Sequence, residues 1–66
     1  MYKLYSVVKA KRKISSEISE GTLGTILIVH DKSVPEAYEV EFVNAEMESL
    51  GVLTVNKDDI IPNPGA

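Results

Sequence analysis

The chain has 66 residues, no cysteine and a formal net charge of −3. A chain of this length forms one domain that buries only about 60% of the surface its unfolded form exposes, and without cysteine neither disulfides nor thiolate metal sites can reinforce it. No segment approaches the roughly 20 apolar residues of a membrane-spanning helix. We therefore expect a soluble cytoplasmic domain over residues 1–62, followed by a frayed tail over residues 63–66.

The charge is divided unevenly along the chain. Residues 1–16 contain five basic and no acidic side chains, whereas residues 17–66 contain two basic and ten acidic ones, so the two parts carry +5 and −8. Such a division indicates either an anionic partner for the basic end or two ends that neutralise each other in the fold. The second interpretation is the simpler one.

The first third of the chain predicts a strand and a long loop. Residues 5–10 have the composition of a β-strand, whereas residues 11–20 lose all periodicity. A loop of this length in so small a domain packs through a few apolar anchors, and Ile14 and Ile18 are the candidates. A single helical turn over these residues is the less favoured alternative.

Residues 24–30 predict a second strand, which is apolar on both faces, so alternation does not show which side chains point inward. The strand is either covered on both sides or bent so that it changes the face it presents. Gly24, near its start, indicates a β-bulge or a close approach of another residue to the backbone.

The clearest strand lies within residues 35–44. Tyr38, Val40 and Phe42 alternate with Glu39 and Glu41, so an extended backbone places three apolar side chains on one face and two carboxylates on the other. The polar turn before it is short enough for a hairpin, which predicts antiparallel pairing with the preceding strand.

The last third predicts two further strands. Residues 50–55 form a strand in which Leu50 and Val52 share one face. Residues 57–60 suggest a short 3₁₀ turn capped by Asp58, and residues 60–61 form a brief last strand.

These elements predict an all-β fold: a small, strongly bent antiparallel SH3-like barrel of four or five strands with a short 3₁₀ turn. Closing the barrel would remove most exposed strand edges. An open meander that completes itself by dimerising is the alternative, so the chain is expected to be a monomer or a homodimer.

Four motifs resemble a family of short bacterial proteins classed as a domain of unknown function. They are E-G-T-L-G-T-I at residues 20–26, A-Y-E-V-E-F-V at residues 37–43, G-V-L-T-V at residues 51–55 and D-D-I-I-P at residues 58–62. The resemblance implies an SH3-like barrel and a partner-binding or antitoxin-type role without catalytic residues. The chain departs from the family in the turn after Y-x-V-E-F, where residues 44–49 contain no glycine.

The acidic side chains and the single histidine give weak evidence for catalysis or metal binding. Glu39 and Glu41 lie about 7 Å apart on one strand face, but no nucleophile or apolar pocket accompanies them, so a solvated face is the better interpretation. Glu46, Glu48, Asp58 and Asp59 do not follow the spacing of a calcium loop, and His30 has no second histidine or cysteine to join it. We expect no catalytic residues, no metal site and no cofactor.

Two binding surfaces are predicted. The first would bind a protein partner through adaptable apolar side chains and an acidic rim; its residues are Ile14, Ile18, Glu36, Glu39, Glu41 and Met47. The second, offered as the alternative, would bind nucleic acid through basic side chains with Tyr2 and Tyr5 close by in sequence; its residues are Lys9, Lys11, Arg12 and Lys13. The acidic chain as a whole disfavours a polyanion, so protein binding is the first hypothesis.

Overall fold

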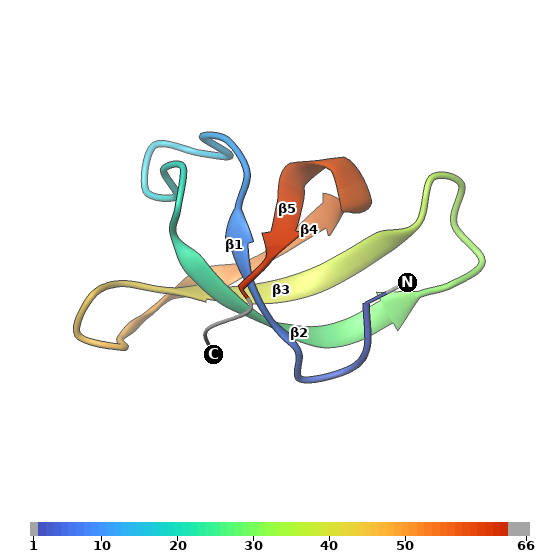
Figure 1. Ribbon diagram of the computed structural model, residues 1–66, viewed down its shortest axis with the longest axis horizontal. Coiled ribbons are helices and arrows are strands. Elements are labelled where there is room, and N and C mark those ends of the chain that lie inside the picture. Colours follow the sequence, from blue (N-terminus) through green and yellow to red (C-terminus); the bar gives the residue numbers. More distant parts are fainter. Residues whose placement is uncertain (1, 64–66) are drawn as a thin grey trace.

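A computed structural model describes residues 2–63 of the chain, so most of the predicted tail lies outside the described residues. The elements are β1 (Val7–Ala10), β2 (Leu23–His30), β3 (Ala37–Val43), β4 (Ser49–Asn56), the 3₁₀ turn η1 (Lys57–Asp59) and β5 (Ile60–Pro62). They form one antiparallel sheet in the order β4-β3-β2-β1-β5 (Figure 1). The predicted all-β class, with five antiparallel strands and one 3₁₀ turn, is confirmed.

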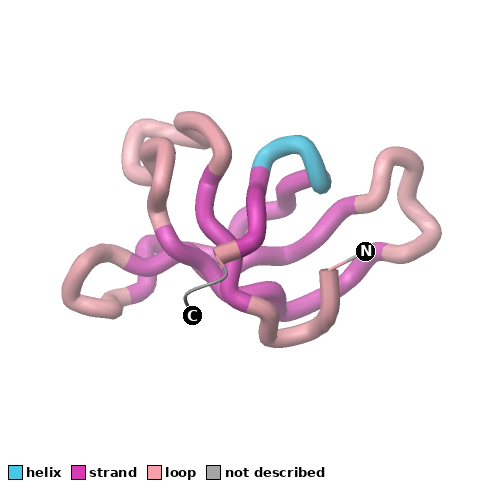
Figure 2. Tube along the Cα trace, viewed as in Figure 1, coloured by secondary structure: helices cyan, strands magenta, loops and turns pink. Residues whose placement is uncertain are grey.

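The sheet is strongly bent. Figure 2 shows β2 and β3 as long curved strands, with β1 and β5 standing across them. Within residues 2–63, no ladder joins β4 to β5. The sheet therefore encloses its core by curvature and leaves two strands at its edges.

The core is built on β3, as its alternation predicts. Tyr38, Val40 and Phe42 are fully buried, and each apolar side chain of this size contributes about 1.5–3 kcal/mol when it leaves water. The other buried side chains come from every remaining strand and from the loop before β2; they are Val8, Ala10, Ile18, Ile26, Val55 and Ile60.

A β-bulge decides which side chains of β2 point inward. Ile26 pairs with Val40 and Ile28 with Glu39, so Leu27 is an extra residue on β2. Ile26 is buried before the bulge, and Ile28 points outward after it with 51% of its surface exposed. Of the two predicted explanations for this apolar strand, the bend is therefore the one observed.

Gly24 on β2 lies directly against two core side chains of β3. A Cβ atom at this position would sit 2.5 Å from Cγ1 of Val40 and 3.0 Å from Cδ1 of Phe42. The predicted close approach is confirmed, whereas the bulge lies further along the strand.

A second irregularity corrects the expected faces of β4. Phe42 pairs with Gly51 and Val43 with Ser49, so Leu50 is the extra residue. Gly51 has a φ of +127°, which glycine adopts without strain. As a result, Leu50 packs against the core while Val52 points outward, and the prediction that these two share a face was wrong.

The start of β1 and the cap of η1 also differ from the sequence prediction. β1 begins at Val7 because Tyr5 has a φ of +65°, in the left-handed region, which interrupts an extended strand. The cap of η1 is Asn56 and not Asp58. Its side-chain oxygen accepts a hydrogen bond from the Asp58 backbone nitrogen at 2.8 Å, and its backbone nitrogen donates to Asp59 at 3.0 Å.

Candidate functional site

The outer face of the sheet, opposite the core, carries both carboxylates of β3. Glu39 pairs with Ile28 of β2 and Thr54 of β4, and Glu41 pairs with Thr25 and Val52. Residues that face each other across antiparallel strands point to the same side. The three strands therefore place these carboxylates in the middle of one surface, which we call the outer face.

Glu39 is held by hydrogen bonds from both neighbouring strands. Nε2 of His30 lies 2.6 Å from Oε2 of Glu39, and the hydroxyl of Thr54 donates to the carboxylate at 2.8 Å. An ionised carboxylate only accepts hydrogen bonds, so Nε2 of His30 is the donor. The hydrogen bond from His30, followed by that from Thr54, lowers the pKa of Glu39, which keeps it ionised at neutral pH.

Apolar side chains lie on either side of the carboxylates. Ile28 on β2 and Val52 on β4 are each 51% exposed. The outer face thus combines fixed negative charge with partly exposed aliphatic surface, a combination that suits contact with another macromolecule.

Glu36 does not belong to the outer face. Its carboxylate accepts a hydrogen bond of 2.7 Å from the hydroxyl of Tyr38, and that hydroxyl accepts one of 3.2 Å from the backbone nitrogen of Tyr2. The rings of Tyr2 and Tyr38 meet edge to face with centroids 5.5 Å apart. Glu36 therefore connects the start of β3 to the N-terminal segment.

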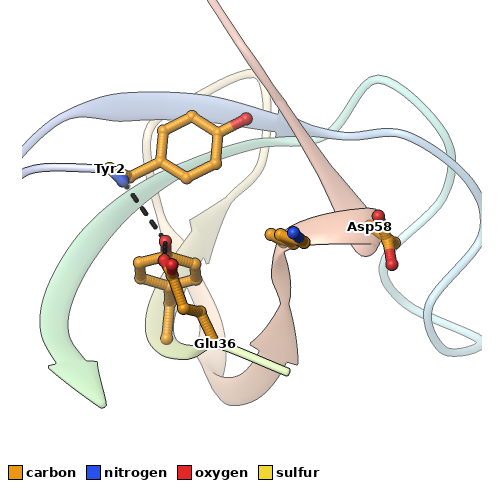
Figure 3. A pocket seen from close by; sticks show the side chains of 5 residues that line it. Tyr2, Glu36 and Asp58 are labelled. Carbon is orange, nitrogen blue, oxygen red and sulfur yellow. Dashed lines mark hydrogen bonds between the residues drawn. The ribbon is translucent and has the colours of Figure 1, made fainter. Parts of the chain in front are cut away.

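These residues line a shallow hollow of about 350 Å³, together with Lys57 and Asp58 of the 3₁₀ turn. Figure 3 shows Tyr2 and Glu36 on one side of the hollow and Asp58 on the other. Burial raises the pKa of Tyr38, as does its hydrogen bond to Glu36, and burial raises the pKa of Tyr2. Both hydroxyls therefore stay protonated at neutral pH, and they act here as hydrogen-bonding groups.

The three apolar residues predicted to touch a partner do not lie on one surface. Ile18 is only 1% exposed and belongs to the core, and Ile14 packs against that core. They anchor the loop as expected, but Ile18 is not available to a partner. Met47 is 70% exposed in the β3–β4 turn, at the opposite end of β3 from Glu36 (Figure 1). Of the six residues predicted to contact a partner, the structure therefore places only Glu39 and Glu41 together on the outer face.

The basic segment is only partly available for binding. Arg12 forms an ion pair with Asp59, 47 positions further along the chain. Burial raises the pKa of Asp59, but the hydrogen bond from the Asn56 backbone and the contacts with Arg12 outweigh it and lower the pKa. This pair is one contact of the kind that the charge division suggested, between the basic start of the chain and its acidic remainder.

The other residues predicted to contact nucleic acid also differ in how exposed they are. Lys11 and Lys13 are exposed, and Lys9 is half-buried on β1. Tyr2 packs against Tyr38 and so does not offer a ring for stacking on a base, whereas Tyr5 is largely exposed.

Two further acidic side chains hold turns: Glu48 accepts a hydrogen bond from the side-chain nitrogen of Asn44 at 3.0 Å, and Asp59 accepts one from the Asn56 backbone at 3.0 Å. The side-chain oxygen of Asn44 accepts hydrogen bonds from the backbone nitrogens of Glu46 and Glu48 in the β3–β4 turn.

Among residues 2–63, no three side chains of the metal-binding types gather closely enough to hold an ion. The same part of the chain contains no helix with the length and apolarity needed to cross a membrane.

Fold and surface together define a small all-β domain with an acidic and partly apolar outer face. The chain belongs to the family described as "Domain of unknown function (DUF4926)", whose sequence profile matches residues 4–62. Neither the curated proteins nor the solved structures contain a match.

Proposed function

We propose that this domain is a non-enzymatic protein-binding module whose outer face recognises a basic surface on its partner. The observation that carries the proposal is the arrangement around Glu39, which is hydrogen-bonded from β2 and β4 and flanked by the half-exposed side chains Ile28 and Val52. A carboxylate already fixed in place loses little side-chain entropy when it pairs with a lysine or an arginine.

Charge supports the same type of partner. The segment from residue 17 to residue 66 carries −8, so a basic protein would be attracted over a distance and its association would weaken with salt. The apolar pair on the outer face would then supply contact area once the partner has docked.

The finer features of this proposal follow from the resemblance and the topology. The five-strand order, the long loop before β2 and the 3₁₀ turn before β5 support an SH3-like barrel. The resemblance implies a bacterial protein, and a chain without cysteine fits a reducing cytoplasm. An antitoxin or immunity-type role is the form of protein binding that this resemblance implies. The partner would then be a basic protein encoded by a neighbouring gene.

Nucleic-acid binding is the second candidate, because Lys11 and Lys13 are exposed beside Arg12. It would predict salt-dependent binding of labelled RNA or DNA that weakens when these three residues are replaced. The ion pair between Arg12 and Asp59 and the packing of Tyr2 against Tyr38 engage two of the groups that this function would use, which makes it the second candidate.

Affinity purification with a matched charge control tests the protein-binding proposal. The tagged wild-type chain is compared with the double variant Glu39→Gln, Glu41→Gln and with the double variant Glu46→Gln, Glu48→Gln. Both variants remove two negative charges, but only the first changes the outer face. We expect one protein to co-purify with the wild type and with the second variant, and to be lost with the first.

The protein identified in this way is then purified and titrated with each variant at low and moderate salt. A dissociation constant raised about tenfold or more by the outer-face variant alone supports the proposal. Equal losses for the two double variants would show that only total charge matters, and no loss for either would show that the outer face is not used.

A further inference from the structure

The two edges of the sheet differ in how well they are protected against pairing with another strand. β5 is only three residues long and ends at Pro62, which has no backbone N–H to donate. β4 is eight residues long and its sequence, S-L-G-V-L-T-V-N, contains no charged residue. Among residues 2–63 it pairs with β3 alone.

Natural edge strands are commonly protected by charged side chains, proline, bulges or short length. The one such device in β4 is the irregularity at Leu50 and Gly51, near its beginning. Residues 52–55 pair regularly with β3, whereas the backbone nitrogen of the next residue, Asn56, already donates to the carboxylate of Asp59. The outer side of residues 52–55 therefore offers backbone donors and acceptors, and these four residues are uncharged.

We propose that β4 pairs antiparallel with β4 of a second copy of this chain and so joins two sheets into one. A second copy fits this edge because β4 is uncharged, so two β4 strands meet without repulsion. Within residues 2–63 the other edge strand, β5, is short and ends at Pro62, so two copies of this chain pair through β4 on both sides and are related by a two-fold axis. Such an interface closes after two subunits and does not propagate into fibres.

Charge is compatible with this pairing. Because β4 is uncharged, no like charges face each other across the new ladder. Glu39 and Glu41 lie one strand further in on β3, so the outer faces of the two copies remain open and lie side by side.

The expected dimer is weak and concentration-dependent. The part of β4 that is free to pair, residues 52–55, spans four residues, or about 13 Å of strand. A strip of this length and one strand wide falls short of the roughly 1,200 Å² or more that stable interfaces bury. Association should therefore increase over an accessible concentration range and not be complete at low concentration.

Sedimentation velocity of the isolated protein over an about hundredfold concentration range tests the proposal. The test variant is Val52→Lys, which places a charge on the edge strand next to Glu41 of the same chain, where it finds a partner within the monomer. The matched control is Ile28→Lys, because Ile28 has the same exposure on the same face but lies on the interior strand β2.

We expect the sedimentation coefficient of the wild type and of Ile28→Lys to rise with concentration, and that of Val52→Lys to stay at the monomer value. A wild type that remains monomeric throughout, or a Val52→Lys variant that associates as well as the wild type, would overturn the proposal. Loss of association in both variants would do so as well, because it would show that the outer face and not the edge is the contact.

Amide hydrogen exchange gives a second measurement that does not depend on a substitution. Pairing of two β4 strands protects alternate backbone amides of β4 at high protein concentration, since only every second N–H of an edge strand points outward. Concentration-dependent protection confined to other elements would contradict the proposal. The measurement needs only this chain, so its result is independent of the proposed protein partner.

Discussion

Replacing Gly24 by alanine tests the closest contact in the core. The new Cβ would lie 2.5 Å from Cγ1 of Val40, and also 3.0 and 3.2 Å from two ring atoms of Phe42. Valine is branched at Cβ and has few rotamers to move to, so the strands must shift apart. Overpacking of this kind costs about 1–3 kcal/mol, and the lower entropy of unfolded alanine offsets about 0.5–1 kcal/mol of it.

A net loss of about 1–2 kcal/mol is large for this chain, because domains of its size have a free energy of unfolding of roughly 3–10 kcal/mol. It corresponds to a fall in Tm of about 5–10 °C. Urea denaturation followed by circular dichroism measures the change, with Thr25→Ala as a control on the opposite face of the same strand. The control should cost less than about 1 kcal/mol.

A double-mutant cycle identifies the contact responsible. Val40→Ala alone removes a buried side chain and should cost about 2 kcal/mol. It also removes the methyl group that the new Cβ would meet. In the Val40→Ala background, Gly24→Ala should therefore lower the free energy of unfolding by at least about 1 kcal/mol less than it does in the wild type. If the losses of the two single variants simply add in the double variant, the contact between the new Cβ and Val40 is not the cause. The effect of Gly24→Ala would then come from some other change in β2.

Three further predictions follow from the core, the outer face and the β3–β4 turn. Ile18→Ala should lower the free energy of unfolding by about 2–5 kcal/mol and Ile14→Ala by clearly less, because only Ile18 is fully buried; equal losses in urea denaturation would contradict this assignment. The pKa of Glu39 is lowered from 4.5, so its contribution to stability, at most about 1 kcal/mol, is present above that pH and is lost as the pH falls through the lower pKa of the folded state. The stability difference between wild type and Glu39→Gln should therefore shrink in acid, and a difference that grows below pH 4.5 would show the opposite sign. Met47 has a φ of +65°, so Met47→Gly should raise the free energy of unfolding by about 0.5 kcal/mol, and the Tm with it. Met47→Ala should raise neither. A fall in Tm for the glycine variant would show that the Met47 side chain is needed in this turn.

The turn at Met47 has a backbone conformation typical of glycine, although it contains no glycine. The resemblance gave reason to expect a glycine after Y-x-V-E-F, and residues 44–49 contain none. The structure nevertheless places Met47 in the left-handed conformation. Asn44 holds this turn through hydrogen bonds to the backbone at Glu46 and Glu48, so a side chain supports a geometry for which glycine is the usual residue.

The loop before β2 shows why Ile18 was wrongly assigned to the predicted binding surface. Ile14 and Ile18 were the evident anchors of an aperiodic segment, and the same two residues were assigned to a partner-binding surface. An anchor cannot also be a surface contact when it is fully buried, as Ile18 is. The signal that could have separated the roles is the small size of the domain, which needs every available apolar side chain for its core.

The sequence by itself determined the central strand, its two faces and the hairpin that joins it to β2, because strict alternation of Tyr38, Val40 and Phe42 with two glutamates has only one extended arrangement that buries the apolar set. Only the tertiary structure decided where the extra residues Leu27 and Leu50 fall, since nothing in the local sequence marks the bulge at Leu27, and Gly51 permits the one at Leu50 without requiring it. The pairing of Arg12 with Asp59 was likewise settled by the fold. Contacts between residues so far apart depend on which segments the bent sheet brings together, and no local pattern encodes that.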